Sequence, residues 1–129
     1  MTATTPVTEL VATCLDSSDA ARLARFYAEL TGGEVTGDYP EYGYAQATVP
    51  GATLNVQTVA DFVRPQWPGQ EHPQQLHLDF RVSDLEQAVA YAVGLGATEA
   101  DHQPGGAMWH VMLDPDGHPF CLCPPRAEA

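Results

Sequence analysis

The order of apolar and polar residues predicts a regular succession of elements in the first half of the chain. Residues 9–16 are apolar and β-branched, which is typical of a strand, and residues 17–33 then change to helical spacing. The apolar face of this helix consists of Leu23, Phe26, Tyr27 and Leu30. Three further strands are predicted at 34–39, 42–49 and 53–59. The first half therefore has the predicted order of strand, helix and three strands.

The second half predicts the same order after a connecting segment. Residues 60–74 contain three prolines and no periodicity, which indicates a connection between two halves. A strand is then predicted at 75–82, and a helix at 84–95 that opens with a capping box of Ser83 and Glu86. The last three predicted strands are 97–103, 107–113 and 118–123.

Fixed offsets between the halves indicate an internal duplication. The pair Ser18-Asp19 recurs as Ser83-Asp84, 65 residues later, and Gly32 recurs as Gly96, 64 residues later. We therefore expect one domain over 1–129, made of a first module at about 8–59, a connection at 60–74 and a second module at about 75–123. Such a duplication can leave a concave cavity between its modules, where a ligand would bind.

Three stretches carry a resemblance to a known superfamily. They are SSDAARLARFYAELTGG, HLDFRVSDLEQAVAYAVGLGA and the closing LDPDGHPFCLC. In order and spacing they resemble the paired modules of the vicinal oxygen chelate proteins, and most of all their glyoxalase-like domain branch. That superfamily includes glyoxalase I, extradiol dioxygenases, and bleomycin- and fosfomycin-resistance proteins. The resemblance implies an α+β fold, in which two tandem βαβββ modules form a curved, mostly antiparallel sheet around a cavity.

The resemblance also implies the positions of a site. Proteins of this superfamily can hold a divalent metal with four strand residues, two from each module. Carried onto this chain, these positions are Ala12 and Gln57 in the first module and His77 and Cys121 in the second. Imidazole and thiolate are good zinc ligands, whereas the Gln57 amide is a weak donor and Ala12 has none. We therefore expect no resident cofactor, with a divalent ion (Zn, Ni, Fe or Mn) at His77, Gln57 and Cys121 as the alternative.

Three other side chains are candidates for contact with a ligand. His110 alternates with Met108 and Met112 along a predicted strand, so that these three share a face. Tyr44 shares a face with Tyr42, and Trp67 lies in the connection, from which it could cover a pocket. The same residues would serve equally well in ordinary packing, as aromatic pairs on strands often do.

Composition narrows the classes of function. The 17 acidic residues outnumber the 5 basic ones, and the formal net charge of −12 would repel a phosphate backbone. We therefore expect no binding to nucleic acid. No apolar run is long enough to span a membrane, and the three cysteines form no disulfide framework. These features indicate a protein of the reducing cytoplasm.

Three functions remain open at this point. The first is a protein that binds a small organic molecule between its modules, with His77 and Gln57 as polar anchors, and it requires no metal. The second is a metal-dependent lyase, isomerase or dioxygenase acting on a substrate with neighbouring oxygens. The third is an enzyme without metal, in which His77 is the general base. The resemblance also implies a homodimer.

Overall fold

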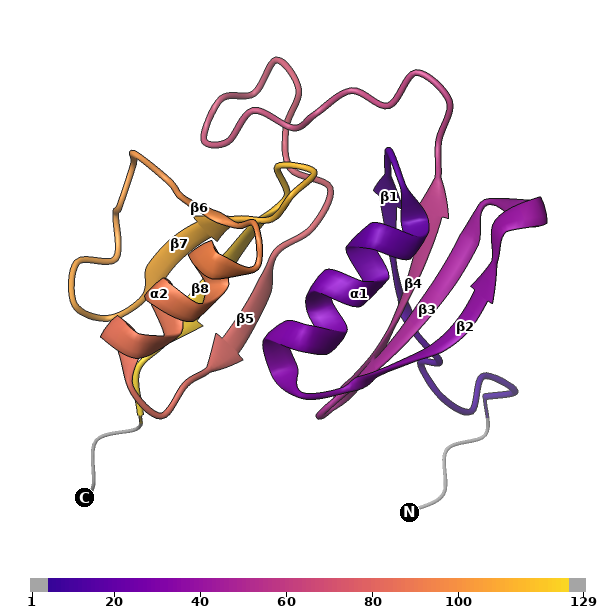
Figure 1. Ribbon diagram of the computed structural model, residues 1–129, viewed down its shortest axis with the longest axis horizontal. Coiled ribbons are helices and arrows are strands. Elements are labelled where there is room, and N and C mark those ends of the chain that lie inside the picture. Colours follow the sequence, from indigo (N-terminus) through magenta and orange to yellow (C-terminus); the bar gives the residue numbers. More distant parts are fainter. Residues whose placement is uncertain (1–4, 126–129) are drawn as a thin grey trace.

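The computed structural model describes residues 5–125 and consists of two βαβββ modules (Figure 1). The elements of the first module are β1 (Thr13–Ser17), α1 (Ala20–Thr31), β2 (Glu34–Tyr39), a short 3-10 turn η1 (Pro40–Tyr42), β3 (Tyr44–Val49) and β4 (Ala52–Thr58). Those of the second are β5 (Leu78–Arg81), α2 (Leu85–Gly94), β6 (Thr98–Glu99), β7 (His110–Leu113) and β8 (Pro119–Cys123). The predicted order of elements and the α+β class are confirmed. In the part of the chain that is described, neither helix has the length and apolarity to cross a membrane.

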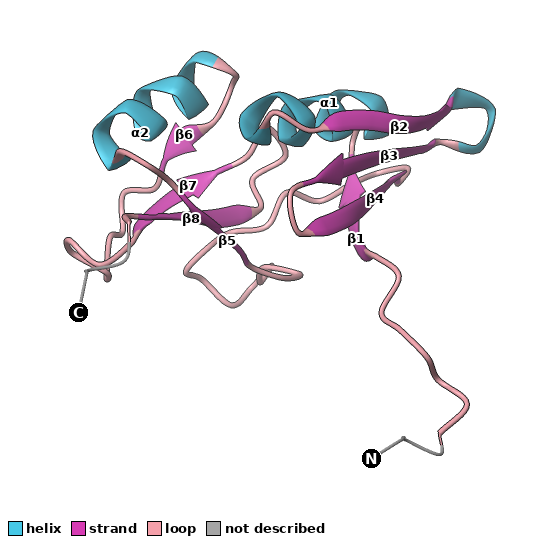
Figure 2. Cartoon of the chain, turned by 90° about the horizontal axis from the view of Figure 1, so that it is seen from below, coloured by secondary structure: helices cyan, strands magenta, loops and turns pink. Residues whose placement is uncertain are grey.

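Each module has its own four-stranded mixed sheet. The strand orders are β1-β4-β3-β2 and β5-β8-β7-β6. In each sheet the first pair, β1 with β4 or β5 with β8, is parallel, and the other pairs are antiparallel. Figure 2 shows both helices on the same side of the two sheets. We call the opposite side, toward which the side chains of Asn55, Gln57, Asp79 and Cys121 point, the open face.

One apolar core joins the two modules on the helix side. The ring of Tyr27 in α1 stacks on Phe80 of β5 with a centroid distance of 6.0 Å, and Phe26 contacts Phe120 of β8 at 5.9 Å. Tyr27, Phe120 and Leu122 are almost completely buried. Helix α1 therefore packs on both sheets, and burial of these side chains is the main force that holds the modules together.

Helix α2 begins one residue later than an N-cap at Ser83 would predict. The Asp84 side chain, in extended backbone geometry, accepts a hydrogen bond from the backbone N–H of Gln87 and is the N-cap of α2. Asp19 caps α1 in the same way. The predicted capping box of Ser83 and Glu86 is therefore wrong. A carboxylate at the next position fills the same role, because N-cap aspartate accepts from the third helical residue.

The turn between β7 and β8 fixes the second module to the first. The Asp116 carboxylate accepts hydrogen bonds from the hydroxyls of Ser17 and Ser18, both at 2.6 Å, and from Arg22 at 2.9 Å. Tyr27 donates its hydroxyl proton to Asp114 at 2.6 Å. These bonds connect residues 87 to 99 positions apart in the chain, and we call them the turn latch.

Candidate binding site on the open face of the second sheet

The site is built from two neighbouring parallel strands. Asp79 of β5 lies opposite Cys121 of β8, and His77 immediately precedes β5. Side chains alternate between the faces of a strand, so Phe80 and Phe120 enter the core while His77, Asp79 and Cys121 share the open face. His77 thus lies beside the thiol of Cys121 and the carboxylate of Asp79.

Hydrogen bonds fix the orientation of His77. Its Nδ1 lies 2.9 Å from Oε1 of Gln74, and because that oxygen accepts, Nδ1 carries the proton. Nε2 of the neutral ring is then an acceptor, and it lies 2.8 Å from Sγ of Cys121. The carboxylate of Asp79 is 3.5 Å from the same nitrogen. The ring therefore directs the lone pair of Nε2 toward the Cys121 thiol.

The Cys121 thiol keeps its proton at neutral pH. Burial, followed by the negative charge of Asp79, raises its pKa to about 12. The same two causes raise the pKa of Cys123. Cys121 is therefore a hydrogen-bond donor here, and it lacks the electropositive surroundings that activate a cysteine nucleophile.

A pocket of about 550 Å³ opens above these groups. We call it the His77 pocket, and its lining residues are His77, Asp79, Arg81, Met108, Trp109, Cys121 and Cys123. Met108 is 72% exposed and Trp109 38%. A Cβ at Gly105 would lie 2.4 Å from the Trp109 ring, so only glycine allows the loop to pack against the indole. Trp109 and Met108 therefore form an apolar wall of the pocket, and its floor carries the polar groups of His77, Asp79 and Cys121.

The expected residues of the first module lie outside this pocket. Ala12 is half-buried just before β1, and Gln57 is exposed on β4. Every residue that lines the His77 pocket belongs to the second module. The structure thus gathers His77 and Cys121 of the expected set, and it places Ala12 and Gln57 elsewhere.

Strand pairing identifies a different counterpart of Cys121 in the first module. Cys14 pairs with Asn55 as Asp79 pairs with Cys121, so Asn55 occupies the equivalent position. Asn55 is half-buried, and its side-chain oxygen accepts a hydrogen bond from Gln46 at 2.9 Å. The offset between the halves is 66 residues at this strand, from 55 to 121, whereas Gln57 and Cys121 are 64 residues apart.

Comparison with protein families identifies the relationship of the chain. A family model described as glyoxalase-like domain matches residues 12–123. The chain belongs to this glyoxalase-like family. Its match covers both modules and the His77 pocket. No protein of curated function matches the sequence.

Solved structures share the fold of this glyoxalase-like protein at low sequence identity. A glyoxalase/bleomycin resistance protein/dioxygenase family enzyme from Burkholderia phytofirmans PsJN has a TM-score of 0.66 at 17% identity, covering 91% of this chain and 98% of its own. The fosfomycin resistance protein FosX of Listeria monocytogenes has a TM-score of 0.67 at 13% identity, covering 93% and 95%. A glyoxalase-related enzyme from Fulvimarina pelagi has 0.65 at 19% identity, covering 92% and 89%. All belong to the vicinal oxygen chelate superfamily, whose fold this chain shares.

The three further candidate residues occupy separate places in the glyoxalase-like fold. His110 on β7 is in register with Leu122, away from the open face, and its Nε2 lies 2.8 Å from Glu99. Tyr44 stacks on Tyr39 on the first sheet. Trp67 packs on the small apolar cluster that contains Cys121. None of the three lines the His77 pocket.

Sequence reasoning passed over three residues of the site. Asp79 lies two residues after His77, and the alternation of a strand was a sufficient signal that the two share a face. Gln74 lies in the connection, where no periodicity existed to indicate its direction. Trp109 gave only the weak signal of an aromatic residue next to a glycine-containing loop.

The donor atoms of the His77 pocket fit a metal ion. His77, Asp79 and Cys121 each offer one ligand atom, and these atoms lie within 4.8 Å of one another. Zinc accepts nitrogen, oxygen and sulfur ligands, and in catalytic sites it keeps one position open beside three protein ligands. The hydrogen bond from His77 to Gln74 is of the kind that orients a metal-binding imidazole. The set therefore fits zinc, although it differs from the four positions that the superfamily resemblance implies.

Proposed function

We propose that this protein binds a small organic molecule in the His77 pocket. The observation that carries the proposal is the contact of 2.8 Å between His77 Nε2 and Cys121 Sγ at the floor of the pocket. A polar group of a ligand would replace this internal hydrogen bond, by accepting from the Cys121 thiol or donating to Nε2 of His77, next to an apolar wall. His77 and Cys121 would anchor the polar end of the ligand, and Trp109 and Met108 would cover its apolar part.

The charge of the chain supports a preference among ligands. A net charge of −12 raises the local concentration of cations near the surface. Asp79 adds a negative group inside the pocket, while Arg81 is partly engaged with the backbone oxygen of Pro124 at 2.6 Å. We therefore expect aromatic cations to bind more tightly than aromatic anions of the same size.

Tryptophan fluorescence tests the proposal, because the chain has two tryptophans and Trp109 lines the pocket. In Trp67→Phe, whose only tryptophan is Trp109, aromatic cations and matched anions would be titrated. We expect the cations to quench the fluorescence of Trp109 in a saturable way. In His77→Ala the affinity should fall about tenfold, because one buried hydrogen bond to the ligand is lost.

The matched control is Trp109→Phe, in which Trp67 is the remaining reporter. It should show little quenching by the same molecules. Equal affinity in His77→Ala, or no quenching of Trp109 in Trp67→Phe, would contradict the proposal.

The cluster of three donors supports a second candidate function, a metal-dependent lyase, isomerase or dioxygenase. His77, Asp79 and Cys121 would hold the ion. A bound zinc ion would polarise an oxygen of the substrate as a Lewis acid. Elemental analysis after dialysis against Zn²⁺, Ni²⁺, Fe²⁺ and Mn²⁺ tests this function. Stoichiometric metal that is absent from His77→Ala would favour it, and absence of metal from the native chain under all four conditions would exclude it.

The proposal includes a homodimer in the cytoplasm. The His77 pocket is lined by one module and opens to one side, so the first sheet of a second copy is suited to cover it. The three cysteines are free, as expected in a reducing compartment. Sedimentation equilibrium tests the dimer: a chain that stays monomeric at millimolar concentration would contradict it.

A further inference from the structure

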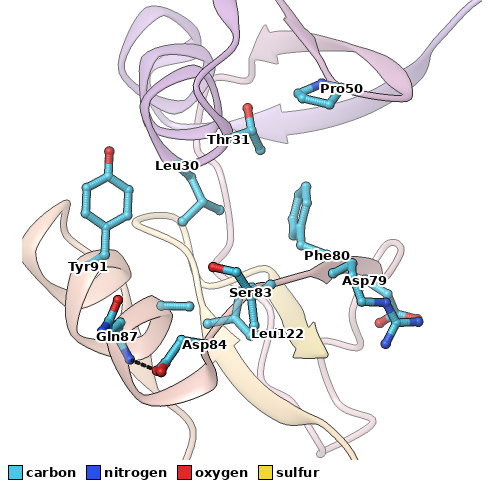
Figure 3. A pocket seen from close by; sticks show the side chains of 13 residues that line it. Leu30, Thr31, Pro50, Asp79, Phe80, Ser83, Asp84, Gln87, Tyr91 and Leu122 are labelled. Carbon is cyan, nitrogen blue, oxygen red and sulfur yellow. Dashed lines mark hydrogen bonds between the residues drawn. The ribbon is translucent and has the colours of Figure 1, made fainter. Parts of the chain in front are cut away.

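A second cavity, larger than the His77 pocket, lies on the helix side of β5 (Figure 3). We call it the β5 groove; its volume is about 670 Å³. Leu30 at the end of α1 and Phe80 of β5 point into it, and together with Leu122 they form an apolar floor. The β5 groove is therefore suited to an aliphatic chain, because burial of such a chain against apolar side chains is favourable.

Two residues of β5 line both cavities. Asp79 and Arg81 belong to the wall of the His77 pocket and also to the wall of the β5 groove. Both are exposed, and Phe80 between them belongs to the core on the helix side. Neighbouring side chains of a strand point to opposite faces of the sheet. The two cavities therefore lie on opposite faces of one sheet and adjoin each other at β5.

The edge of β5 between the two cavities is free. Within residues 5–125, β5 pairs with β8 alone. The backbone N–H of Val82 donates to the carbonyl of Cys123 at 2.9 Å, so the backbone groups of Val82 face β8. In a parallel pair these directions alternate along the strand, and the N–H and C=O groups of Asp79 and Arg81 therefore point away from β8. No hydrogen bond from another element of the described chain reaches them.

An elongated molecule that crosses this edge would meet three kinds of group in order. In the His77 pocket it meets the carboxylate of Asp79 and the indole of Trp109. At the edge it meets backbone N–H and C=O groups, to which a secondary amide can bond as a neighbouring strand does. On the helix side it meets the apolar floor of the β5 groove. The order of groups matches a cation, an amide and an aliphatic tail.

We propose that the two cavities bind one elongated amide, with an aromatic cationic end in the His77 pocket, its amide group at the edge of β5 and an aliphatic tail in the β5 groove. The inference rests on the function proposed above and names the class of its ligand. The carboxylate of Asp79, 3.5 Å from Nε2 of His77, provides a negative charge beside the cationic end. One molecule in both cavities loses its translational freedom only once, so its affinity exceeds that of either end alone.

A series of acylated diamines tests the length of the site on the full chain. The probes are p-xylylenediamine acylated on one nitrogen with acetyl, butanoyl or hexanoyl, so that each has one aromatic ammonium end and one amide. Affinity is measured by quenching of Trp109 in Trp67→Phe. The hexanoyl compound should bind at least tenfold more tightly than the acetyl compound, because each buried CH₂ group contributes up to about fourfold.

Methylation of the amide nitrogen tests the contact with the strand edge. The methylated hexanoyl compound keeps its cation and its tail but has lost the amide donor. Its affinity should be about three- to tenfold lower than that of the parent compound, as for one lost hydrogen bond. Equal affinity of the two compounds would overturn the placement of the amide at the edge of β5.

Variants of the β5 groove locate the aliphatic tail. Ala88→Phe places a ring in the groove and should reduce the affinity for the hexanoyl compound to that for the acetyl compound. Val93→Phe, at an exposed position of the same helix outside the groove, is the matched control. Leu30→Ala removes part of the floor instead, and should lower the affinity for the hexanoyl compound at least threefold even where Ala88→Phe does not fold.

The acetyl compound separates this inference from the proposed function, because it reaches the His77 pocket alone. Binding of the acetyl compound that is weakened in His77→Ala, with no gain from the longer acyl groups, would overturn the inference and leave the function intact. A gain with chain length that is the same in Leu30→Ala and the parent chain would also overturn it. Absence of quenching by all three compounds would overturn both.

Discussion

At the scale of single residues, the Cys121 thiol is the group whose chemistry depends most on its neighbours. His77 accepts its hydrogen bond, and the carboxylate of Asp79 disfavours the thiolate. A cation bound at the same place would reverse this balance, because it would favour the thiolate and displace the proton. Affinity for a metal should for this reason increase with pH, as it does wherever a ligand must be deprotonated.

We predict that Cys121 reacts slowly with iodoacetamide. With a pKa of about 12 rather than the ordinary value near 9, its thiolate fraction at pH 8 is lower by about a thousandfold. Cys14 is exposed and serves as an internal reference in the same molecule. Asp79→Asn removes one of the two causes and should speed the alkylation of Cys121 without changing that of Cys14.

Peptide mass spectrometry across a pH series gives the three rates separately. Cys123→Ser checks that the neighbouring thiol does not account for the signal. Reaction of Cys121 as fast as Cys14 at pH 8 would show that the thiolate is stabilised, contrary to the burial and the carboxylate seen around it.

At the scale of elements, the turn latch connects α1 and β1 to the turn before β8. Burial raises the pKa of Asp114 and keeps Tyr27 protonated by raising its pKa well above the ordinary value. We predict that Tyr27→Phe lowers the free energy of unfolding by about 1–3 kcal/mol, since it leaves a buried carboxyl oxygen without its donor. Tyr91→Phe is the matched control, because that hydroxyl bonds to the Glu29 carbonyl at an exposed site and should cost less. Urea unfolding at pH 7 measures both losses. Equal losses in the free energy of unfolding would show that the buried bond to Asp114 contributes no more than the exposed bond to Glu29.

Asp116 should make the latch sensitive to acid. Burial acts to raise its pKa, but hydrogen bonds from Ser17 and Ser18 and the charge of Arg22 outweigh burial, so the net pKa is lowered. A carboxyl whose pKa is lower in the folded state contributes its full stability above the unfolded pKa, near 4, and loses it as pH falls through the folded value.

Asp116→Asn should therefore be less stable than the native chain at pH 7, and the difference should shrink below about pH 4. Urea unfolding at intervals from pH 7 to pH 3 measures the difference, with Asp101→Asn, in an exposed loop, as control. A difference that stayed constant or grew in acid would contradict the lowered pKa.

Local patterns predicted the elements well where a strand had its partner nearby. The predicted strand 34–39 coincides with β2, which pairs with the next strand along the chain. The predicted strand 9–16 begins only at Thr13, which pairs with Leu54 of β4. In this register residues 9 and 10 would extend beyond the start of β4 at Ala52 and have no partner in that strand. The sequence alone contains no signal for where a distant partner strand begins.

The candidate site was predictable in part for a similar reason. The superfamily resemblance implied His77 and Cys121, which the structure brings together. For β4 it implied Gln57, whereas strand pairing makes Asn55 the equivalent of Cys121. A difference of two residues keeps the same face of a strand but moves the side chain by about 6.6 Å. The contact with Gln74 depends on the path of the connection, which no pattern specifies.

At the scale of the whole molecule, the two modules contribute unequally to the site. The open face of the second sheet carries an imidazole beside a carboxylate and a thiol, His77, Asp79 and Cys121. That of the first sheet also carries a thiol and a carboxylate, Cys14 and Asp16, in register with the amides of Asn55 and Gln57, but it carries no imidazole. The duplication has therefore kept the fold in both halves, while the histidine of the site lies in one. The amide-rich sheet is suited to contact uncharged polar groups of a ligand or of a second copy.

The net charge of −12 on 129 residues affects the whole molecule, and it leads to a prediction about salt. Among residues 5–125, Arg22 with Asp116 is the only arginine–carboxylate ion pair within 4.0 Å, so repulsion among carboxylates is not offset by many close pairs. Repulsion of this kind destabilises a compact state, and ions screen it over a Debye length of about 10 Å at 0.1 M. We therefore expect the midpoint of thermal unfolding to rise by several degrees between about 0.02 and 0.5 M NaCl. Potassium chloride over the same range is the control for a specific effect of sodium. A midpoint that falls with salt would show that attraction between opposite charges outweighs the repulsion among carboxylates.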